Sequence, residues 1–386
     1  MSKSVVILSY ARTPIGSFLG SLGEVSASKM ASHAIQFAIS SARLEPSEIG
    51  LGVMGQVLSA GCGQAPVRQA MLGAGVPERV DSFSVNKVCS SGMKAITIAA
   101  QSIMLGEVDC AVAGGMESMS QVPHALRKAR KGITKLGSIA MDDLVISDGL
   151  WDVYNDIHMG SCAEKTSRDH KISRREQDEY AIESYKRAAA AWSSGLMTDG
   201  EVVPYKDFDK DEEIDKLKVE KMANLRPAFE ENGVITAANA SKLNDGAAAV
   251  VLASEDFARS NGLTPIAKLL SWADFATSPI DFSIAPAHAV NLALKRARLA
   301  VKDIDFWEMN EAFSCVPIVN AKNLHVDLSR VNVDGGAVAI GHPIGMSGTR
   351  IVGALTRILR QRDGSIGCAS ICNGGGGSTA LVIKRY

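Results

Sequence analysis

The sequence predicts a layered α/β fold made of two related halves, with a further segment inserted between them. Three observations support this: short β-branched runs alternate with alanine-rich helical patterns, the same order of elements occurs twice, and charged residues become denser mid-chain. With 386 residues, 46% of them hydrophobic and 22% charged, the chain is long enough for two or three structural units around a large core.

The predicted strands are short and apolar. They stand at residues 4–9, 109–115, 247–254 and 367–372, and alanine-rich helical patterns stand at 28–44 and 289–300. This alternation is typical of buried sheets that are covered by helices.

The internal repeat joins a Ser-Gly helix start to a strand that ends in glycines. In the first half SSGMKAITIAAQSI (90–103) leads into VDCAVAGGMES (108–118); in the second MSGTRIVGALTRIL (346–359) leads into GCASICNGGGGS (367–378). We therefore expect two copies of one α/β unit that face each other.

Between the halves lie a basic run at 127–135, a charged helix at 173–192 and the segment DKDEEIDKLKVEK at 209–221. Such a charge-rich insertion, taken alone, is more often a solvent-facing elaboration than a binding unit. We predict an N-terminal half at 1–119 completed by 243–268, an inserted loop subdomain at 120–242, and a C-terminal half at 269–386.

The overall charge points to no macromolecular partner. Lys and Arg total 41 against 42 Asp and Glu, so no net field attracts nucleic acid or an anionic membrane. The seven cysteines include no Cys-x-x-Cys pair, which argues against a zinc site and favours reduced thiols in an intracellular compartment. No apolar run reaches the roughly 20 residues of a membrane span. The opening MSKSVVILSYARTPIG reads as lacking a presequence, and the final KRY is not a peroxisomal signal.

Cys89 and His342 stand at the two mirrored helix starts. A lone cysteine is usually a small core residue, but at a helix start the unpaired N–H groups favour negative charge and predict a lowered thiol pKa. His342, between Gly341 and Pro343, could be a structural residue, yet the repeat would set it across from Cys89. A Cys–His pair is the common way to activate a thiol nucleophile.

Two further segments complete the set of candidate catalytic residues. The run CNGGGG begins with Cys372 and is followed by a β-branched run rather than a helix, which excludes a dinucleotide loop and suits backbone N–H groups that approach a ligand. Cys372 could also be a buried strand residue. Asn310 opens NEAF and is either a turn residue or a group that orients a water.

Together these segments resemble the thiolases. The resemblance is carried by ARTPIGSFLG, GQAPVRQA, VNKVCSSGMKAI, AGGMESMS, NEAF, GGAVAIGHPIGMSG and CNGGGG, which span essentially the whole chain. Within the family DVYNDIHMGSCAE and TAANAS are similar to the mitochondrial-type acetyl-CoA acetyltransferases. The resemblance implies a duplicated five-layer α-β-α-β-α fold with an inserted loop subdomain, and acetyl transfer between two acetyl-CoA molecules, reversibly, through an acetyl-cysteine.

The resemblance also implies roles for single residues. Cys89 would be the nucleophile, with His342 as its general base, and Cys372 would remove the α-proton of the second acetyl-CoA. The N–H groups of Cys89 and Gly374 would hold the tetrahedral oxyanion. His342 and a water on Asn310 would hold the enolate.

Coenzyme A is the implied substrate, and no other cofactor is required for the chemistry. The residues that resemble its contacts are Leu150, His158, Met159, Tyr185, Lys216, Leu217, Lys218, Lys221, Ser241, Ala312 and Phe313. A potassium ion is also implied, held by Tyr185 and by backbone oxygens of Ala237, Ala238, Ala240 and Val338.

Other interpretations stay open at this stage. They are a 3-ketoacyl-CoA thiolase of broader chain length, a β-ketoacyl synthase, which would need a Cys-His-His set, and a non-catalytic CoA or lipid binder. The resemblance implies a homotetramer built as a dimer of dimers, with basic loops near the CoA entrances. It favours the mitochondrial matrix and a place in fatty acid, ketone body or isoleucine metabolism, with the cytoplasm as the alternative. Acceptance of 2-methylacetoacetyl-CoA stays open.

Overall fold

The structure is a computed structural model that describes residues 3–127, 129–132 and 136–386. Its centre is a mixed ten-stranded sheet with the order β12-β13-β14-β11-β1-β10-β5-β3-β4, in which β2 pairs with β10. The first half contributes β1 (Val5–Arg12), β2 (Gly16–Ser17), β3 (Leu51–Gly55), β4 (Asp81–Val85), β5 (Cys110–Ser118) and β10 (Asn244–Ser254). The second half contributes β11 (Ala267–Ala276), β12 (Phe306–Met309), β13 (Ile366–Asn373) and β14 (Gly377–Arg385).

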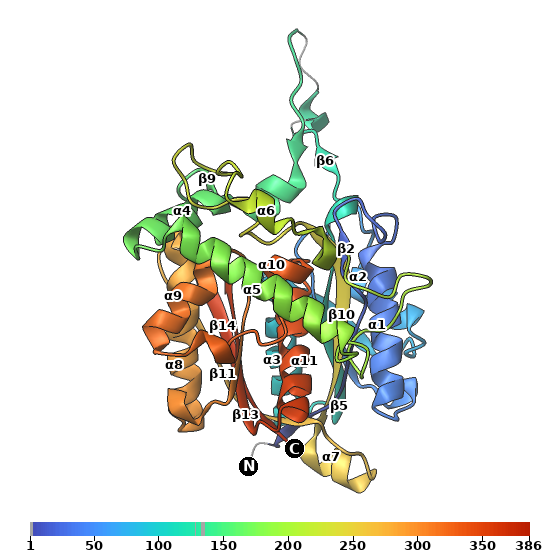
Figure 1. Cartoon of the computed structure of the whole chain (residues 1–386). Helices are drawn as coiled ribbons and strands as arrows, with labels where there is room; N and C mark the ends of the chain where they lie inside the picture. Colours follow the sequence, from blue (N-terminus) through green and yellow to red (C-terminus); the bar gives the residue numbers. More distant parts are fainter. Residues whose placement is uncertain (1–2, 128, 133–135) are drawn as a thin grey trace.

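The two halves of the sheet face each other and are joined where β1 pairs with the start of β11, through the pairs Val6–Lys268 and Ile7–Ala267. Helices α1 (Ala27–Ser41) and α2 (Pro66–Gly73) cover the outer face of the first half, and α8 (Ala285–Ala297) and α9 (Cys315–Leu324) cover that of the second. Helices α3 (Ser91–Leu105) and α11 (Ser347–Gln361) lie between the halves (Figure 1). The predicted five-layer α-β-α-β-α arrangement is confirmed.

Glycines allow the two central helices to approach closely at their starts. A Cβ on Gly92 would lie 2.6 Å from Oγ1 of Thr349, and a Cβ on Gly348 would lie 2.5 Å from the backbone nitrogen of Met93. Because neither position has room for a side chain, the starts of α3 and α11 meet at one point. Helices α3 and α11, which the internal repeat predicted as a pair, therefore form the central layer of the molecule.

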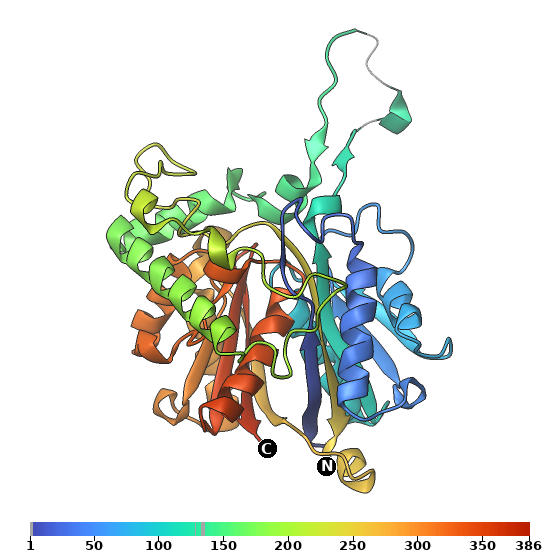
Figure 2. The same ribbon diagram turned by 45° about the vertical axis from the view of Figure 1, so that its right-hand side comes forward.

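The segment between β5 and β10 covers one end of both halves (Figures 1 and 2). It includes β6 (His124–Ala125), β7 (Asp142–Asp143), a π-helical turn (Ile146–Leu150), β8 (Trp151–Asp152), β9 (Ile157–His158), α4 (Met159–Asp169), α5 (Arg174–Ser193) and α6 (Val219–Met222). Helix α5 confirms the charged helix predicted at 173–192. The β6–β7 arm projects away from the body in both views.

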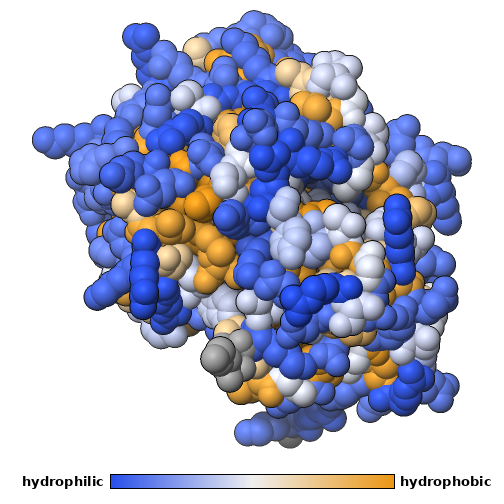
Figure 3. Space-filling view, turned by 90° about the horizontal axis from the view of Figure 1, so that it is seen from below, coloured by the Kyte–Doolittle hydropathy of each residue, from blue (hydrophilic) through white to orange (hydrophobic). Residues whose placement is uncertain are grey.

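The opposite end of the molecule carries both termini in Figure 1 and is seen from below in Figure 3. Hydrophilic side chains dominate its outline, and apolar side chains gather in smaller patches between them. Two short helices, α7 (Glu255–Ser260) and α10 (Ala337–Ile340), are also present. The candidate catalytic residues lie instead toward the covered end, where the sheets finish and the central helices start.

Candidate active site

Cys89 lies in a tight turn between β4 and α3. Val88 adopts a φ of 47°, a left-handed conformation that is uncommon for a β-branched residue. The hydroxyl oxygen of Ser91 accepts a hydrogen bond from the backbone N–H of Lys87 at 2.8 Å and donates to the carbonyl of Val88 at 2.5 Å. These bonds hold the turn closed, so the thiol is presented directly before the first turn of α3.

The surroundings of the Cys89 thiol are apolar and tightly packed. Burial raises the pKa of Cys89 to about 11, although the backbone N–H groups of Gly374 and of Cys89 itself donate to the thiol and lower its pKa in part. The predicted lowering of this pKa is therefore wrong, because desolvation outweighs the helix start. At neutral pH the group is a thiol that needs a base before it can attack.

Cys372 and Gly374 reach the same place from the end of β13. The hydroxyl of Ser90 donates to the carbonyl of Ile371 at 3.3 Å, which fixes the strand end beside the Cys89 turn. A Cβ on Gly374 would lie 3.6 Å from Cγ1 of Val88. Burial raises the pKa of Cys372 well above its usual range, and nearby Cys89 raises it further. The two thiols and the Gly374 N–H group therefore share one site.

His342 is held as a neutral imidazole, and its contacts favour one tautomer. Burial, followed by the charge of Arg350, lowers the pKa of His342 to about 3. Its Nδ1 lies 2.6 Å from the hydroxyl of Ser347, and this hydroxyl donates to the carbonyl of Pro343 at 3.0 Å. Since the Ser347 proton is already used, Nδ1 carries the hydrogen and Nε2 keeps its lone pair.

The loop that carries His342 packs against the start of α3. A Cβ on Gly92 would lie 2.9 Å from the carbonyl oxygen of Gly345, and Ile344 belongs to the same apolar cluster as Val88 and Cys89. The backbone N–H of His342 donates to Oδ1 of Asn244 at 3.0 Å. His342 and Cys89 therefore stand on two loops that touch.

Asn310 stands at the end of β12, next to the histidine. Its backbone N–H donates to the carbonyl of Ser370 at 3.0 Å, and its Nδ2 lies 3.4 Å from Nε2 of His342. Its Oδ1 is buried and has no hydrogen-bond partner among the described residues. A buried acceptor of this kind is free to accept a hydrogen bond from a water or a ligand.

A cavity of about 520 Å³ opens beside His342. Five of the expected coenzyme A contacts line this cavity: Leu150, His158, Lys216, Ser241 and Phe313. Met159 and Ala312 pack in the apolar cluster behind it, together with Cys372.

A neighbouring cavity of about 250 Å³ is lined by the other expected contacts, Tyr185, Leu217, Lys218 and Lys221, and shares Lys216 with the first. The predicted coenzyme A contacts therefore line two adjoining cavities.

Three of the five expected potassium ligands, Tyr185, Ala240 and Val338, contact the amine of Lys242. Nζ of Lys242 donates to the carbonyl oxygens of Ala240 at 3.0 Å and Val338 at 2.9 Å. It lies 5.1 Å from the ring centroid of Tyr185. Burial lowers the pKa of Lys242 to about 8, while Glu213 and Glu311 raise it, so the amine is mostly protonated at neutral pH. Because an ammonium takes two of the carbonyls and repels a second cation, these residues do not fit a potassium ion.

Sequence reasoning missed several residues that hold the site together. Glu117 on β5 accepts hydrogen bonds from the N–H groups of Leu58 and Gly345, at 3.1 Å and 2.9 Å. Burial raises the pKa of Glu117 to about 7, against the lowering by these N–H groups. The sequence signal for Glu117 was a single charged residue inside the otherwise uncharged run AVAGGMES. The signals for the other two residues were weaker: Ser347 is a hydroxyl residue at a helix start, and Lys242 is a single lysine in an otherwise uncharged run.

A thiol, a neutral imidazole and two converging N–H groups form the set that acyl transfer requires. A second buried thiol beside the first can serve a separate proton transfer.

The comparisons with known proteins agree with this chemistry. The thiolase N-terminal domain matches residues 5–256, and the thiolase C-terminal domain matches 263–385. The chain is 51% identical over 99% of its length to the mitochondrial acetyl-CoA acetyltransferase of Homo sapiens, covering 91% of that protein. It is 50% identical over its whole length to that of Danio rerio, covering 92%. The crystal structure of Acat5 thiolase from Ascaris suum in complex with coenzyme A matches with a TM-score of 0.96 and 44% identity, covering 100% of both chains.

Proposed function

The chain belongs to the thiolase family, and from that premise we propose that it is an acetyl-CoA acetyltransferase. It joins two acetyl-CoA molecules to acetoacetyl-CoA and CoA, and it catalyses the reverse thiolysis. The observation that carries this proposal is the pair of N–H groups, of Cys89 and Gly374, that reach the Cys89 thiol. Donors in that position are aimed where a negative oxygen develops during attack on a thioester.

In the first half-reaction Cys89 attacks the thioester carbonyl and gives its proton to Nε2 of His342. The N–H groups of Cys89 and Gly374 stabilise the tetrahedral oxyanion, each contributing about 3 kcal/mol. When this intermediate collapses, the CoA thiolate leaves and takes the proton of Cys372. The products are acetyl-Cys89, a thiolate at Cys372 and a protonated His342, with no net change in protons.

In the second half-reaction the Cys372 thiolate removes the α-proton of another acetyl-CoA. The enolate oxygen is held by Nε2–H of His342 and by a water on the Oδ1 of Asn310, which has no other partner among the described residues. The enolate carbon attacks acetyl-Cys89, and the departing Cys89 thiolate recovers its proton from His342. Both thiols and the neutral imidazole are then restored.

Coenzyme A occupies the two adjoining cavities. Burial lowers the pKa of His158. Its ring stacks on Phe229 at 4.8 Å between centroids, which gives the narrow pantetheine arm a flat wall. Lys218 and Lys221 are exposed at the second cavity and suit the nucleotide phosphates. We assign no role to potassium in this chain, since the ammonium of Lys242 takes two of the expected carbonyl ligands, those of Ala240 and Val338.

The inserted segment is accordingly proposed as the CoA-binding subdomain, at 120–242, between an N-terminal half (1–119 with 243–268) and a C-terminal half (269–386). We also propose that the protein is a homotetramer. We place it in the mitochondrial matrix, because the similar proteins from Homo sapiens and Danio rerio are mitochondrial. Of the basic loop at 127–135, Lys128 and residues 133–135 lie outside the described residues.

Thiolysis of 3-ketoacyl-CoA substrates of increasing length tests the proposed activity. We expect the highest kcat/KM with acetoacetyl-CoA and a loss of at least about tenfold with a 3-ketoacyl chain of eight carbons. The 2-methyl derivative of acetoacetyl-CoA belongs in the same series. A kcat/KM that rises with chain length would replace this proposal with a broad 3-ketoacyl-CoA thiolase.

A further inference from the structure

Lys242 connects two segments that border the active-site cavity. Its backbone follows the loop at 237–241, and its ammonium reaches the carbonyl of Val338 in α10, four residues before His342. The same ammonium also donates to the carbonyl of Ala240. The side chain lines both the cavity beside His342 and the neighbouring one.

The surroundings of this ammonium are those of a cation site. Two carbonyl oxygens lie at 3.0 Å and 2.9 Å, and the face of Tyr185 lies 5.1 Å away. The carboxylates of Glu213 and Glu311 act on it from farther off, and neither forms an ion pair with it among the described residues. Carbonyl oxygens, an aromatic face and distant acids stabilise a single positive charge whether a lysine or a monovalent metal ion supplies it.

Further hydrogen bonds connect the segments that the ammonium contacts. Ser241 donates its N–H and its hydroxyl to the carbonyl of Ala312, at 3.1 Å and 2.9 Å, and Glu311 accepts the backbone N–H of Val338 at 3.0 Å. The cation therefore completes a ring of contacts that joins the loop at 237–241, the NEAF segment and α10. Without a positive charge, two buried carbonyls in this ring would lose their partner.

We propose that the ammonium of Lys242 is a built-in monovalent cation, which takes the place of a potassium ion and makes the enzyme independent of potassium. Lys242 acts as a positioning residue, because it holds the cavity wall and α10 and does not contact the reacting atoms. The inference rests on the proposed function only for its kinetic readout.

The first test uses the wild-type protein. KM for acetoacetyl-CoA and the melting temperature are measured in about 0.1 M KCl and in choline chloride of equal ionic strength, so that screening is the same in both. We expect neither quantity to differ between the salts. A KM at least about threefold lower in KCl, or a higher melting temperature in KCl, would show that a metal ion still binds and would overturn the proposal.

The second test compares two substitutions of the same lysine. Lys242→Ala removes the charge and opens space, whereas Lys242→Met removes the charge and keeps the volume. In choline chloride we expect both variants to have a KM raised by about tenfold, since two buried carbonyls are left unpaired. KCl should restore Lys242→Ala to within about threefold of wild type and raise its melting temperature, and it should leave Lys242→Met unchanged.

Only a cation site gives this difference between the two variants, because a purely structural role would make both defects independent of the salt. Lys384→Ala, which removes an exposed lysine from β14, controls for the change in net charge and should behave as wild type. Lys242→Ala with the same KM and melting temperature in both salts would refute the inference. The melting readout needs no turnover, so a different substrate would leave it valid. If Lys242→Ala folds only in KCl, that result supports the proposal. If the variant folds in neither salt, the proposal is decided by the KM and melting temperature of the wild type in the two salts.

Discussion

At the scale of single residues, the protonation of Cys89 and His342 decides how the chemistry starts. Burial raises the pKa of Cys89 to about 11 and lowers that of His342 to about 3. Both shifts favour the neutral pair, thiol and imidazole, over thiolate and imidazolium. In the free enzyme the proton therefore stays on sulfur and moves only when a thioester is in place.

This neutral pair predicts how Cys89 reacts with an alkylating agent. The thiolate fraction of a group with a raised pKa grows as the pH rises, so the rate of alkylation by iodoacetamide should increase about tenfold per pH unit from 6 to 9. Mass spectrometry of the modified peptide measures the rate at Cys89 alone. A rate that levels off below pH 7 would instead mean a preformed thiolate–imidazolium pair.

The second thiol has a separate role that substitution can isolate. Cys372→Ala should still form acetyl-Cys89 from labelled acetyl-CoA, because a CoA thiolate can leave and take its proton from water. The variant should lose at least about a thousandfold in condensation, because removal of the α-proton needs the Cys372 thiolate as its base. Deuterium exchange from solvent into acetyl-CoA should stop in the variant. Exchange at the wild-type rate would leave Cys372 as a packing residue, and Cys89→Ser, which should not be acetylated, is the matched control.

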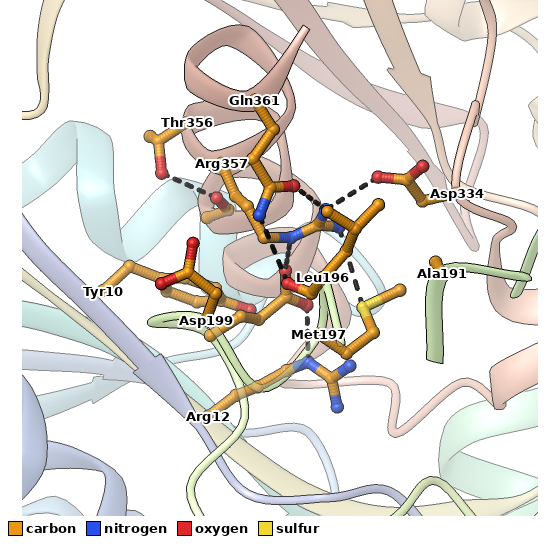
Figure 4. Close-up of polar contacts among 12 residues, drawn as sticks. Tyr10, Arg12, Ala191, Leu196, Met197, Asp199, Asp334, Thr356, Arg357 and Gln361 are labelled. Carbon is orange, nitrogen blue, oxygen red and sulfur yellow. Dashed lines mark hydrogen bonds and ion pairs between the residues drawn. The ribbon is translucent and has the colours of Figure 1, made fainter. Parts of the chain in front are cut away.

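At the scale of elements, a buried charge network ties the inserted segment to the central helix layer (Figure 4). Glu201 accepts hydrogen bonds from Nε of Arg12 on β1 at 2.8 Å and from Nε of Arg357 on α11 at 2.6 Å. The two arginines are further paired with Asp211 and Asp334, each at 2.7 Å. All five side chains are buried, so each charge depends on its partners.

Glu201→Gln should destabilise the protein by about 3–5 kcal/mol, because two buried guanidinium groups then share one carboxylate less. Burial alone would raise the pKa of Glu201, but Arg357 and Arg12 lower it to about 2. A lowered carboxyl pKa gives stability above the unfolded pKa of about 4.3, and this stability is lost as the pH falls toward 2.

Urea unfolding between pH 7 and 3 measures both effects. The difference in unfolding free energy between wild type and Glu201→Gln should shrink as the pH decreases from about 4.5. A difference that stays constant over this range would mean that the carboxylate does not carry the stabilisation.

At the scale of the whole molecule, the motifs predicted the fold and the identity of the site better than its electrostatics. Cys89, His342 and Cys372 could be found because each stands in a segment whose order repeats between the halves. The direction of the shift in the Cys89 pKa could not be predicted, since the burial comes from residues far away in sequence, such as Ile344 in the same apolar cluster. Lys242 was missed because a lysine between Ser241 and Leu243 gives no sign that it folds back onto Val338.

The projecting β6–β7 arm belongs to this scale because three apolar side chains among its described residues are exposed. Leu136, Ile139 and Met141 are 92%, 49% and 60% exposed, although apolar side chains gathered on one arm are usually buried against a partner. The arm extends beyond the body of the molecule (Figure 2), where another subunit could cover it. This supports the proposed dimer of dimers, with the arm at the contact between dimers.

Replacing all three residues by glutamate should therefore convert the tetramer to a dimer, because three charges cannot be buried in that contact. The arm lies outside the catalytic set, so the melting curve of the dimer should stay cooperative and each subunit should keep the ability to form acetyl-Cys89. Light scattering combined with gel filtration measures the mass of wild type and variant. A wild-type monomer or dimer would refute the assembly itself, and a variant that stays tetrameric would move the contact to another surface.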